Sequence, residues 1–363
     1  MRSVGVEEEL LLVDPVTGEP QALSTAVLAA ASRGADRDGG SVFESELHRE
    51  QLEFATRPQT CMRELGTELR RWRAEAARHA GRMGAAVAAL ATSPLPVSPS
   101  ISSDERYLWL RREFGLTAQE QLTCGCHVHV SVDSDEEGVG VLDRIRPWLS
   151  VLLALSANSP FWQGADSEYS SYRSRVWGRW PSAGPVEIFG SARRYHEQVE
   201  AMLGTGALRD KGMVYFDARL SHTYPTVEVR VADVCLDPAT TVLLATLTRG
   251  LVETAARQWQ SGEPPASHGV GLLRLASWRA GRSGLEGRLI HPATLAPEPA
   301  GTVVRALFDH VRDALDGDDL PLAREGLDQV LKDGTGARVQ RDLLNRTGSL
   351  RAVVAACLED APE

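Results

Sequence analysis

The stretch MVYFDARLSHTYPTVEVRVAD, residues 213–233, contains two segments in which apolar and polar side chains alternate. Alternation with a period of two is typical of a β-strand that buries one of its faces. A short loop, residues 222–225, would separate the two segments, and a loop of this length joins neighbouring strands into a hairpin. The stretch therefore predicts a pair of antiparallel strands and, with it, an antiparallel sheet.

The rest of the chain predicts more strands, interrupted by long helices. Strands are expected at 4–13, 51–56 and 123–132. Helices are expected at 62–91, 141–157, 238–259, 302–316, 320–331 and 338–358, and the segment 158–185 is expected to be irregular. Because the strands do not alternate regularly with helices, the pattern favours an α+β fold with an antiparallel sheet. No domain boundary is evident, so residues 1–363 are expected to form a single domain.

The composition argues against several classes of protein. A net charge of −10 is unfavourable for a general binder of nucleic acid or of anionic membranes. The longest apolar run, LSVLLALSA at 149–157, is too short to span a bilayer, and no signal peptide precedes Gly5. Five cysteines, an odd number in a long chain, make a disulfide framework unexpected. We therefore expect a cytoplasmic protein with reduced thiols.

Each of four predicted strands places ionisable side chains on one face. They are Glu7 and Glu9 in 4–12, His127 and His129 in 124–132, Asp217 and Arg219 in 214–220, and Glu228 and Arg230 in 226–231. One such face could simply be solvated, but carboxylates gathered on a single sheet face repel each other unless cations neutralise them. Mg²⁺ and Mn²⁺ commonly join enzyme carboxylates to substrate phosphates, and arginine suits phosphate or carboxylate. The pattern therefore favours metal–nucleotide chemistry.

The hairpin and the first strand predict specific ion pairs. A loop at 222–225 would place Arg219 opposite Glu228, and Asp217 opposite Arg230. In the first strand Glu8 lies on the apolar face, opposite to its two glutamate neighbours. It therefore needs a partner, most simply an arginine, or a position at the rim of the sheet.

The segment ESELHREQLEF at 44–54 adds Glu46, Glu50 and Glu53 and has two interpretations. As a helix, these three side chains would share one charged surface, which is the simpler interpretation. If 51–56 is a strand, Glu53 faces the ionisable cluster and Glu46 comes from the loop before it.

Signatures of other enzyme classes are absent from the sequence. It has no Walker-type phosphate loop, no dinucleotide-binding glycine pattern and no His-Glu-x-x-His helix. A nucleophile at Cys124 or Cys126 with a neighbouring histidine is conceivable, but no third group that would orient the histidine is identifiable. The pair is more simply explained by packing in the core.

Six motifs occur in the order in which they are found in one known family: GVEEELLLVD, LEFAT, GCHVHVSV, LSANSPFWQG, TVEVRVAD and SGLEG. In these motifs, and over nearly the whole length, the chain resembles the carboxylate–amine ligases related to the class 2 glutamate–cysteine ligases. The resemblance implies the catalytic fold of glutamine synthetases and guanidino kinases, a curved, largely antiparallel sheet that forms a funnel with helices outside. It further implies an ATP-dependent carbon–nitrogen ligase that joins a carboxylate and an amine through an acyl phosphate and releases ADP.

The resemblance also implies cofactors and residue roles. ATP and Mg²⁺ or Mn²⁺ would be required, and the metal ligands would be Glu7, Glu9, Glu46, Glu53, His127 and Glu228. Arg230 matches the phosphate-binding arginine, and Arg173 resembles a second catalytic contact to substrate or phosphate. Arg219 and His129 would lie near the nucleotide or substrate. A homodimer or larger homo-oligomer is expected by the same analogy.

The segment YSSYRSRVWGRWPSAG, 169–184, departs from the glutamate-specific version of the family in its aromatic and arginine content. It leaves open which acid and which amine are used. Three alternatives remain open: a phosphotransferase of the guanidino-kinase type, a metal-dependent hydrolase, and a non-catalytic relative that binds nucleotide and metal.

Overall fold

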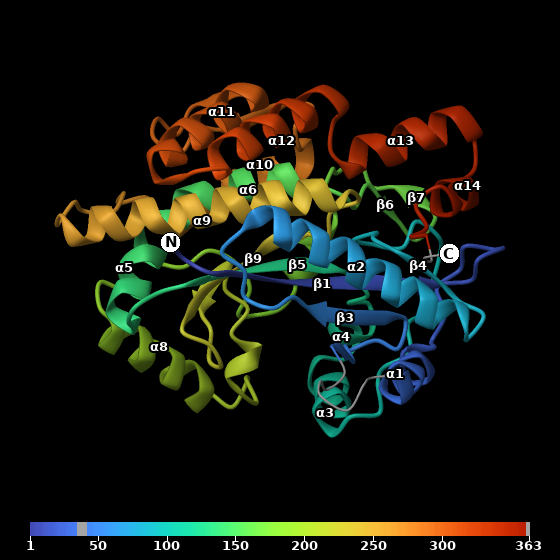
Figure 1. The fold of residues 1–363 in the computed structure, drawn as a ribbon. Helices are drawn as coiled ribbons and strands as arrows, with labels where there is room; N and C mark the ends of the chain where they lie inside the picture. The colour runs from blue at the N-terminus through green and yellow to red at the C-terminus, as the bar shows by residue number, and fades with distance from the viewer. Residues whose placement is uncertain (35–41, 361–363) are drawn as a thin grey trace.

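Strand β1 (Val4–Val13) lies in the middle of a seven-stranded sheet whose order is β2-β3-β1-β5-β9-β8, with β4 also paired to β1 (Figure 1). The computed structural model describes residues 1–34 and 42–360. The other six strands are β2 (Phe43–Glu44), β3 (Gln51–Ala55), β4 (Ala86–Ala88), β5 (Gly125–Ser131), β8 (Ala218–Leu220) and β9 (Thr226–Asp233). All of the pairings are antiparallel, so the predicted sheet type is confirmed.

One face of the sheet is covered by helices that pack on its apolar side chains. The covering helices are α2 (Met62–Gly81), α5 (Asp135–Ile145), α6 (Leu149–Ser156) and α9 (Pro238–Gln260). Val6, Leu10 and Leu12 of β1 point into this layer and are almost completely buried. An outer layer of α10 (Val270–Ser283), α11 (Ala300–Val311) and α12 (Asp319–Asp333) packs on α6 and α9 (Figure 1). The core therefore lies between the sheet and these helices.

Shorter elements frame the other face of the sheet and the two ends of the molecule. They are α1 (Ser24–Gly34), α3 (Glu105–Phe114), α4 (Leu116–Gln119), β6 (Phe161–Trp162), β7 (Ala165–Asp166), α7 (Arg173–Trp177), α8 (Ala192–Gly204), β10 (Arg288–Ile290), β11 (Pro297–Pro299), α13 (Gly336–Thr347) and α14 (Leu350–Ala355), with 3₁₀ turns at Arg146–Trp148, Lys211–Met213 and Arg312–Ala314. In Figure 1, α1, α3 and α8 lie on the side of the sheet away from α11 and α12. No helix among residues 1–34 and 42–360 is long and apolar enough to cross a membrane.

Three predicted helices are wrong in their extent, and each has a local reason. The helix expected at 62–91 ends at Gly81, because Gly84 turns the chain with a φ of 77° and Val87 then pairs with β1. The helix expected at 141–157 is divided at Pro147, which has no N–H for the helical hydrogen bonds. The helix expected at 338–358 is interrupted by Gly348, whose φ of 65° is left-handed.

Candidate active site

The register of β1 with its two neighbours gathers four of the predicted site residues. Glu7 lies opposite His127 of β5, and the imidazole Nδ1 is 3.1 Å from a carboxylate oxygen of Glu7. Glu9 lies opposite Glu53 of β3. All four side chains line one cavity of about 330 Å³ on the face of the sheet away from α2 and α9. The alternation that predicts this face is therefore confirmed for β1, β3 and β5.

Strands β5, β8 and β9 extend the same face. His129 lies opposite Glu228, and Glu228 in turn lies opposite Arg219, whose Nε donates to it at 2.7 Å. The predicted pair of Arg219 with Glu228 is confirmed. A bulge in β9 places both Arg230 and Val231 opposite His127, which breaks the strict alternation of this strand.

The predicted pair of Asp217 with Arg230 is wrong. The two residues are joined through the backbone, where the amide of Arg230 donates to the carbonyl of Asp217 at 2.9 Å. The guanidinium of Arg230 instead pairs with Glu228. Asp217 lies before the first residue of β8, outside the ladder, and its side chain lines a separate cavity.

Segment 44–54 does not form the charged surface helix of the simpler interpretation. It contains the short strands β2 and β3, with a loop between them that carries Glu46. Glu46 and Glu53 both line the 330 Å³ cavity. Glu50 turns away from it and accepts hydrogen bonds at 3.0 Å from the amide of Ser100.

Three carboxylates crowd one side of this cavity: Glu9, Glu46 and Glu53. Burial and then the charge of Glu46 raise the pKa of Glu9 to about 7. The same two causes raise the pKa of Glu53 well above its usual value. Carboxylates in this arrangement hold protons at neutral pH unless a cation takes the place of those protons.

Two groups of side chains have the geometry of a metal site. In each group three ligand atoms lie within 4.8 Å of one another; one group is Glu7, Glu53 and His127, and the other is Glu7, His129 and Glu228. Oxygen-rich sets of this kind suit hard divalent cations. His129 is a predicted nucleotide or substrate contact, and the geometry places it within one of these sets.

The two histidines differ in their protonation. Burial, followed by the charge of Arg230, lowers the pKa of His127 to about 4, so its imidazole is neutral at pH 7. Its Nε2 is buried and has no hydrogen-bond partner among the described residues. Burial opposes protonation of His129 too, but the hydrogen bond and charge of Glu7 raise its pKa. A neutral, partly unpaired imidazole beside raised carboxylates fits a divalent metal, because metals bind the deprotonated forms of both groups.

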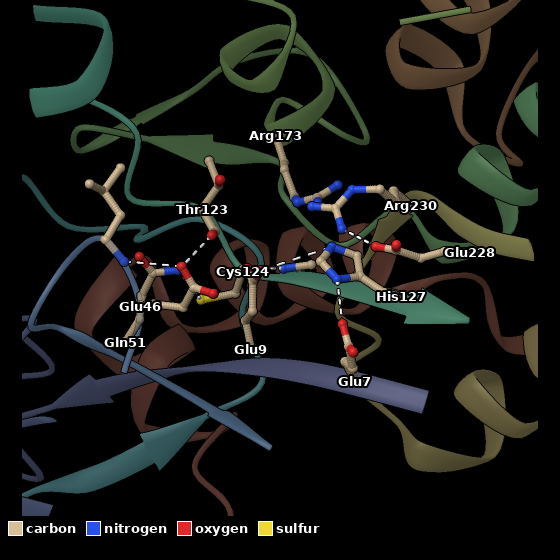
Figure 2. A network of polar contacts seen from close by, with 12 residues as sticks. Glu7, Glu9, Glu46, Gln51, Thr123, Cys124, His127, Arg173, Glu228 and Arg230 are labelled. Atoms are coloured by element: carbon tan, nitrogen blue, oxygen red, sulfur yellow. Dashed lines mark hydrogen bonds and ion pairs between the residues drawn. The ribbon is translucent and has the colours of Figure 1, made fainter. Parts of the chain in front are cut away.

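Two arginines lie near the histidines: Arg230 lines this cavity, and Arg173 lines the separate cavity that also contains Asp217. Arg230 and Arg173 lie with their guanidinium carbons 5.7 and 5.4 Å from the ring centre of Trp177. Figure 2 shows Arg230 reaching toward Glu228 and Arg173 entering from above, next to His127. Burial opposes ionisation of Glu228, but the charges of Arg230 and Arg219 lower its pKa. Arg230 and Arg219 thus place positive charge in the wall of the cavity.

Glu8 has the partner that the sequence requires. Its two carboxylate oxygens accept from Nε and Nη2 of Arg73 on α2 at 2.7 and 2.8 Å, and both side chains are at most 1% exposed. Thr241 of α9 donates a third bond to Glu8 at 2.7 Å. The predicted arginine partner is confirmed, and the pair joins β1 to the two covering helices.

Several residues of the cavity wall are not singled out by the sequence. Arg106 and Tyr107 of α3, Tyr215 before β8, and Trp180 after α7 all line it. The aromatic and arginine content of 169–184 is a signal for Trp180 alone, and it predicts a covering segment but not this contact. Only the folded structure brings these residues together, because α3 and the hairpin are far apart in the sequence.

Comparison with known proteins gives the family that the sequence motifs resemble. The model of glutamate–cysteine ligase family 2 matches residues 3–356. A Streptomyces avermitilis protein named "Putative glutamate--cysteine ligase 2-1" is 67% identical over 360 residues, covering 99% of each chain. A Streptomyces coelicolor protein named "Putative glutamate--cysteine ligase 2" is 65% identical over 359 residues, covering 99% of this chain and 98% of its own.

Solved structures share the fold at low sequence identity. A glutamate–cysteine ligase from Francisella tularensis, solved in complex with AMP, superposes with a TM-score of 0.71 at 12% identity and covers 98% of this chain and 87% of its own. A bifunctional glutathione synthetase from Pasteurella multocida gives a TM-score of 0.71 at 15% identity, covering 98% of this chain and 51% of its own. The predicted fold class is therefore confirmed.

Proposed function

The chain belongs to glutamate–cysteine ligase family 2, and from this premise we propose that it joins a carboxylate of glutamate to the amino group of cysteine at the cavity built around Glu7. Members of this family are ATP-dependent carbon–nitrogen ligases, and this chain is such a ligase. The observation that carries the assignment to this cavity is the pair of metal-compatible groups sharing Glu7, with Arg230 beside them.

Divalent metal, Mg²⁺ or Mn²⁺, would be held by the six predicted ligands together with His129. Glu7, Glu53 and His127 would form one position, Glu7, His129 and Glu228 a second, and Glu9 and Glu46 would complete the acidic side. When bound, the metal supplies positive charge to the phosphate oxygens of ATP. Mg²⁺ is the favoured ion, because carboxylates and substrate phosphates are its usual ligands in such enzymes.

The arginines would act on the transferring phosphoryl group. Arg230 is paired with Glu228 and would exchange this carboxylate for phosphate oxygens when ATP is bound. Arg219 holds Glu228 from the opposite side and keeps the carboxylate in place during this exchange. Arg173 would add a second guanidinium beside the same group.

The chemistry proceeds in two transfers. A carboxylate oxygen attacks the γ-phosphorus of ATP, the bond to the bridging oxygen breaks, and ADP leaves. The neutral amine then attacks the acyl carbon, the bond to the phosphate oxygen breaks, and the nitrogen loses one proton. Water must be excluded meanwhile, because an acyl phosphate hydrolyses. The segment 158–185, which carries Arg173 and Trp177, is the proposed cover.

The test is an assay of the full chain with ATP, Mg²⁺, L-glutamate and L-cysteine. The expected products are ADP, phosphate and the amide in equal amounts. Release of AMP and pyrophosphate would contradict the acyl-phosphate route. ADP with a phosphorylated substrate and no amide would indicate a phosphotransferase, and turnover without ATP would indicate a hydrolase. Nucleotide binding with no turnover of any acid and amine would indicate a binding protein.

Three further properties are part of the proposal. One catalytic domain over residues 1–363 fits the seven-stranded sheet that carries most of the site residues. Five free cysteines, four of them buried, fit a reducing cytoplasmic setting, where ATP is also supplied. A homodimer or larger homo-oligomer is the expected assembly, and light scattering of the purified chain would measure it.

A further inference from the structure

The two arginines near the histidines differ in how their charge is balanced. Arg230 pairs directly with Glu228. Arg173 is 2% exposed, its side chain forms no hydrogen bond with residues 1–34 or 42–360, and its Nε is buried without a partner there. Its one ion pair in this part of the chain is with Asp233 at the end of β9, where Nη1 lies 4.0 Å from Oδ1. This distance is too long for a hydrogen bond, so the donors of Arg173 stay free.

Asp233 does not bind these donors more closely because other groups already occupy its oxygens. Its Oδ2 accepts from the backbone amide of Asn158 at 2.9 Å and from the hydroxyl of Ser159 at 2.7 Å. Its Oδ1 accepts from the hydroxyl of Ser171 at 2.8 Å. Burial raises the pKa of Asp233, and the charge of Arg173 together with these three hydrogen bonds opposes the rise. Donors of this kind favour the charged form, so Asp233 is an anion that is bonded elsewhere.

The same network holds the backbone from which Arg173 projects. The hydroxyl of Ser159 accepts from the backbone amide of Arg173 at 3.0 Å, and the carbonyl of Ser159 accepts from the amide of Tyr172 at 3.0 Å. Asp233, Ser159 and Ser171 line neither the cavity around Glu7 nor the one that Arg173 lines. They do not touch a ligand in either cavity, so they can act on a ligand only through Arg173.

Gly125 of β5 makes room for the guanidinium. It lies opposite Asp233 in the pairing of β5 with β9. A Cβ atom at this position would lie 2.3 Å from Nη2 of Arg173, well inside van der Waals contact. The guanidinium carbon is also 5.4 Å from the centre of the Trp177 ring. Arg173 is therefore held by packing and by charge, and a ligand need not break a hydrogen bond to reach its donors.

We propose that Asp233 is a positioning residue, which balances the charge of Arg173 without taking its hydrogen-bond donors. The inference rests on the proposed function, in which Arg173 acts on the transferring phosphoryl group. Donors that are unpaired in the free protein can bind phosphoryl oxygens without first leaving another partner. Ser171 decides the balance, because Oδ1 is the oxygen of Asp233 nearest to Arg173, and Ser171 is its one hydrogen-bond donor among the described residues.

The variant that tests this role is Ser171→Ala, which frees Oδ1 of Asp233 and leaves the carboxylate charged. The freed oxygen should bring Nη1 of Arg173 into a direct ion pair of about 2.8 Å, and a crystal structure of the ligand-free variant measures that distance. A non-hydrolysable ATP analogue with Mn²⁺ should then bind about threefold to tenfold more weakly in calorimetry. Binding of ADP with Mn²⁺ should not change, because ADP has no γ-phosphate.

Arg173→Met sets the upper limit of the effect and forms a double-mutant cycle with Ser171→Ala. Alone, it should weaken binding of the analogue about tenfold or more. In the Arg173→Met background, Ser171→Ala should have no further effect on binding, because no guanidinium remains to pair with Asp233. A merely structural role of Ser171 would instead persist in that background.

Thr92→Val is the matched control. It removes another buried hydroxyl, which donates at 2.8 Å to the carbonyl of Phe161 and contacts neither Asp233 nor Arg173. In urea denaturation it should lose about as much stability as Ser171→Ala. It should nevertheless bind the analogue with the affinity of the wild type.

The inference and the proposed function fail in different ways. Unchanged affinity for the analogue in Ser171→Ala, or an equal effect of this substitution with and without Arg173, would overturn the inference alone. Unchanged affinity in Arg173→Met would also overturn it, because Arg173 would then not contact the γ-phosphate. If the wild-type chain forms no amide, the proposed function fails, and the binding cycle still decides the inference. A wild-type chain that does not bind the analogue would overturn both.

Discussion

Strand β1 carries glutamates on both of its faces, and their surroundings differ. On the helical face, Glu8 is completely buried, yet three donors from Arg73 and Thr241 satisfy it. On the other face, Glu7 and Glu9 lie among further carboxylates, and burial and Glu46 raise the pKa of Glu9 to about 7. The protein thus neutralises Glu8 with its own arginine and gives Glu7 two histidine partners. Glu9, beside Glu46, has no arginine partner within 4 Å among the described residues and is left to be neutralised by something the protein binds. The first face is therefore structural and the second functional.

The largest expected effect comes from breaking the structural face. Arg73→Met should lower the free energy of unfolding by about 3–5 kcal/mol, because it leaves Glu8 charged, buried and unpaired. Urea denaturation measures this change. Arg70→Met is the control on the same helix, because Arg70 is exposed, and it should change stability by less than about 1 kcal/mol. Equal stability of the two variants would contradict the role given to Arg73.

On the functional face, Glu53→Gln should reduce activity without reducing stability. It should reduce kcat about a hundredfold or more, because one metal-compatible group loses its carboxylate. The metal-free protein should be as stable as the wild type or more stable, since one of three crowded carboxylates is gone. Steady-state assays and thermal unfolding in a chelator measure both. Destabilisation comparable to that of Arg73→Met would show that Glu53 has a structural role.

The functional face should also depend on pH. The folded-state pKa of Glu9 is raised to about 7, so below this pH the group holds a proton that a divalent metal must displace. Through Glu9 alone, affinity for Mn²⁺ should therefore rise about fivefold from pH 6 to pH 7 and about twofold more above pH 7. The raised pKa values of Glu53 and His129 add to this rise. His127 does not compete, because its pKa of about 4 leaves it neutral over this range. Calorimetric titration of Mn²⁺ at several pH values measures the slope, and an affinity that falls with rising pH would contradict the assignment.

The smallest effect should come from Glu50. This glutamate of segment 44–54 belongs to neither metal-compatible group and points away from the cavity. Glu50→Gln should cost about 1 kcal/mol of stability, because the amide oxygen still accepts from the backbone of Ser100. Its kcat and KM values should equal those of the wild type. A loss of activity on the scale of Glu53→Gln would mean that the strand interpretation of this segment has assigned the wrong glutamates.

Much of the functional face could be predicted, because β-strands alternate. Alternation alone places Glu7 and Glu9 together and identifies Glu8 as the residue that needs an arginine. The register of β8 with β9, and hence the pair of Arg219 with Glu228, follows from the loop length. The order of the strands does not follow from the sequence, since β1 lies between β3 and β5 through long-range pairing.

Other features depend on tertiary contacts that local sequence does not encode. The β9 bulge opposite His127 leaves Arg230 paired with Glu228 rather than with Asp217. Val87 has a helical pattern around it but enters β4, because pairing with β1 is stronger than the local preference. The separate cavity that Arg173 and Asp217 line forms between α7, α10 and the start of β8, which no spacing in the sequence connects.

The central claim is that the Glu7 face holds divalent metal at the phosphates of ATP. A crystal grown with Mn²⁺ and a non-hydrolysable ATP analogue tests it most directly. We expect anomalous scattering peaks between Glu7, Glu53 and His127 and between Glu7, His129 and Glu228, with the γ-phosphate in contact with Arg230. Manganese at any other place in the chain, or a γ-phosphate that does not reach Arg230, would contradict it.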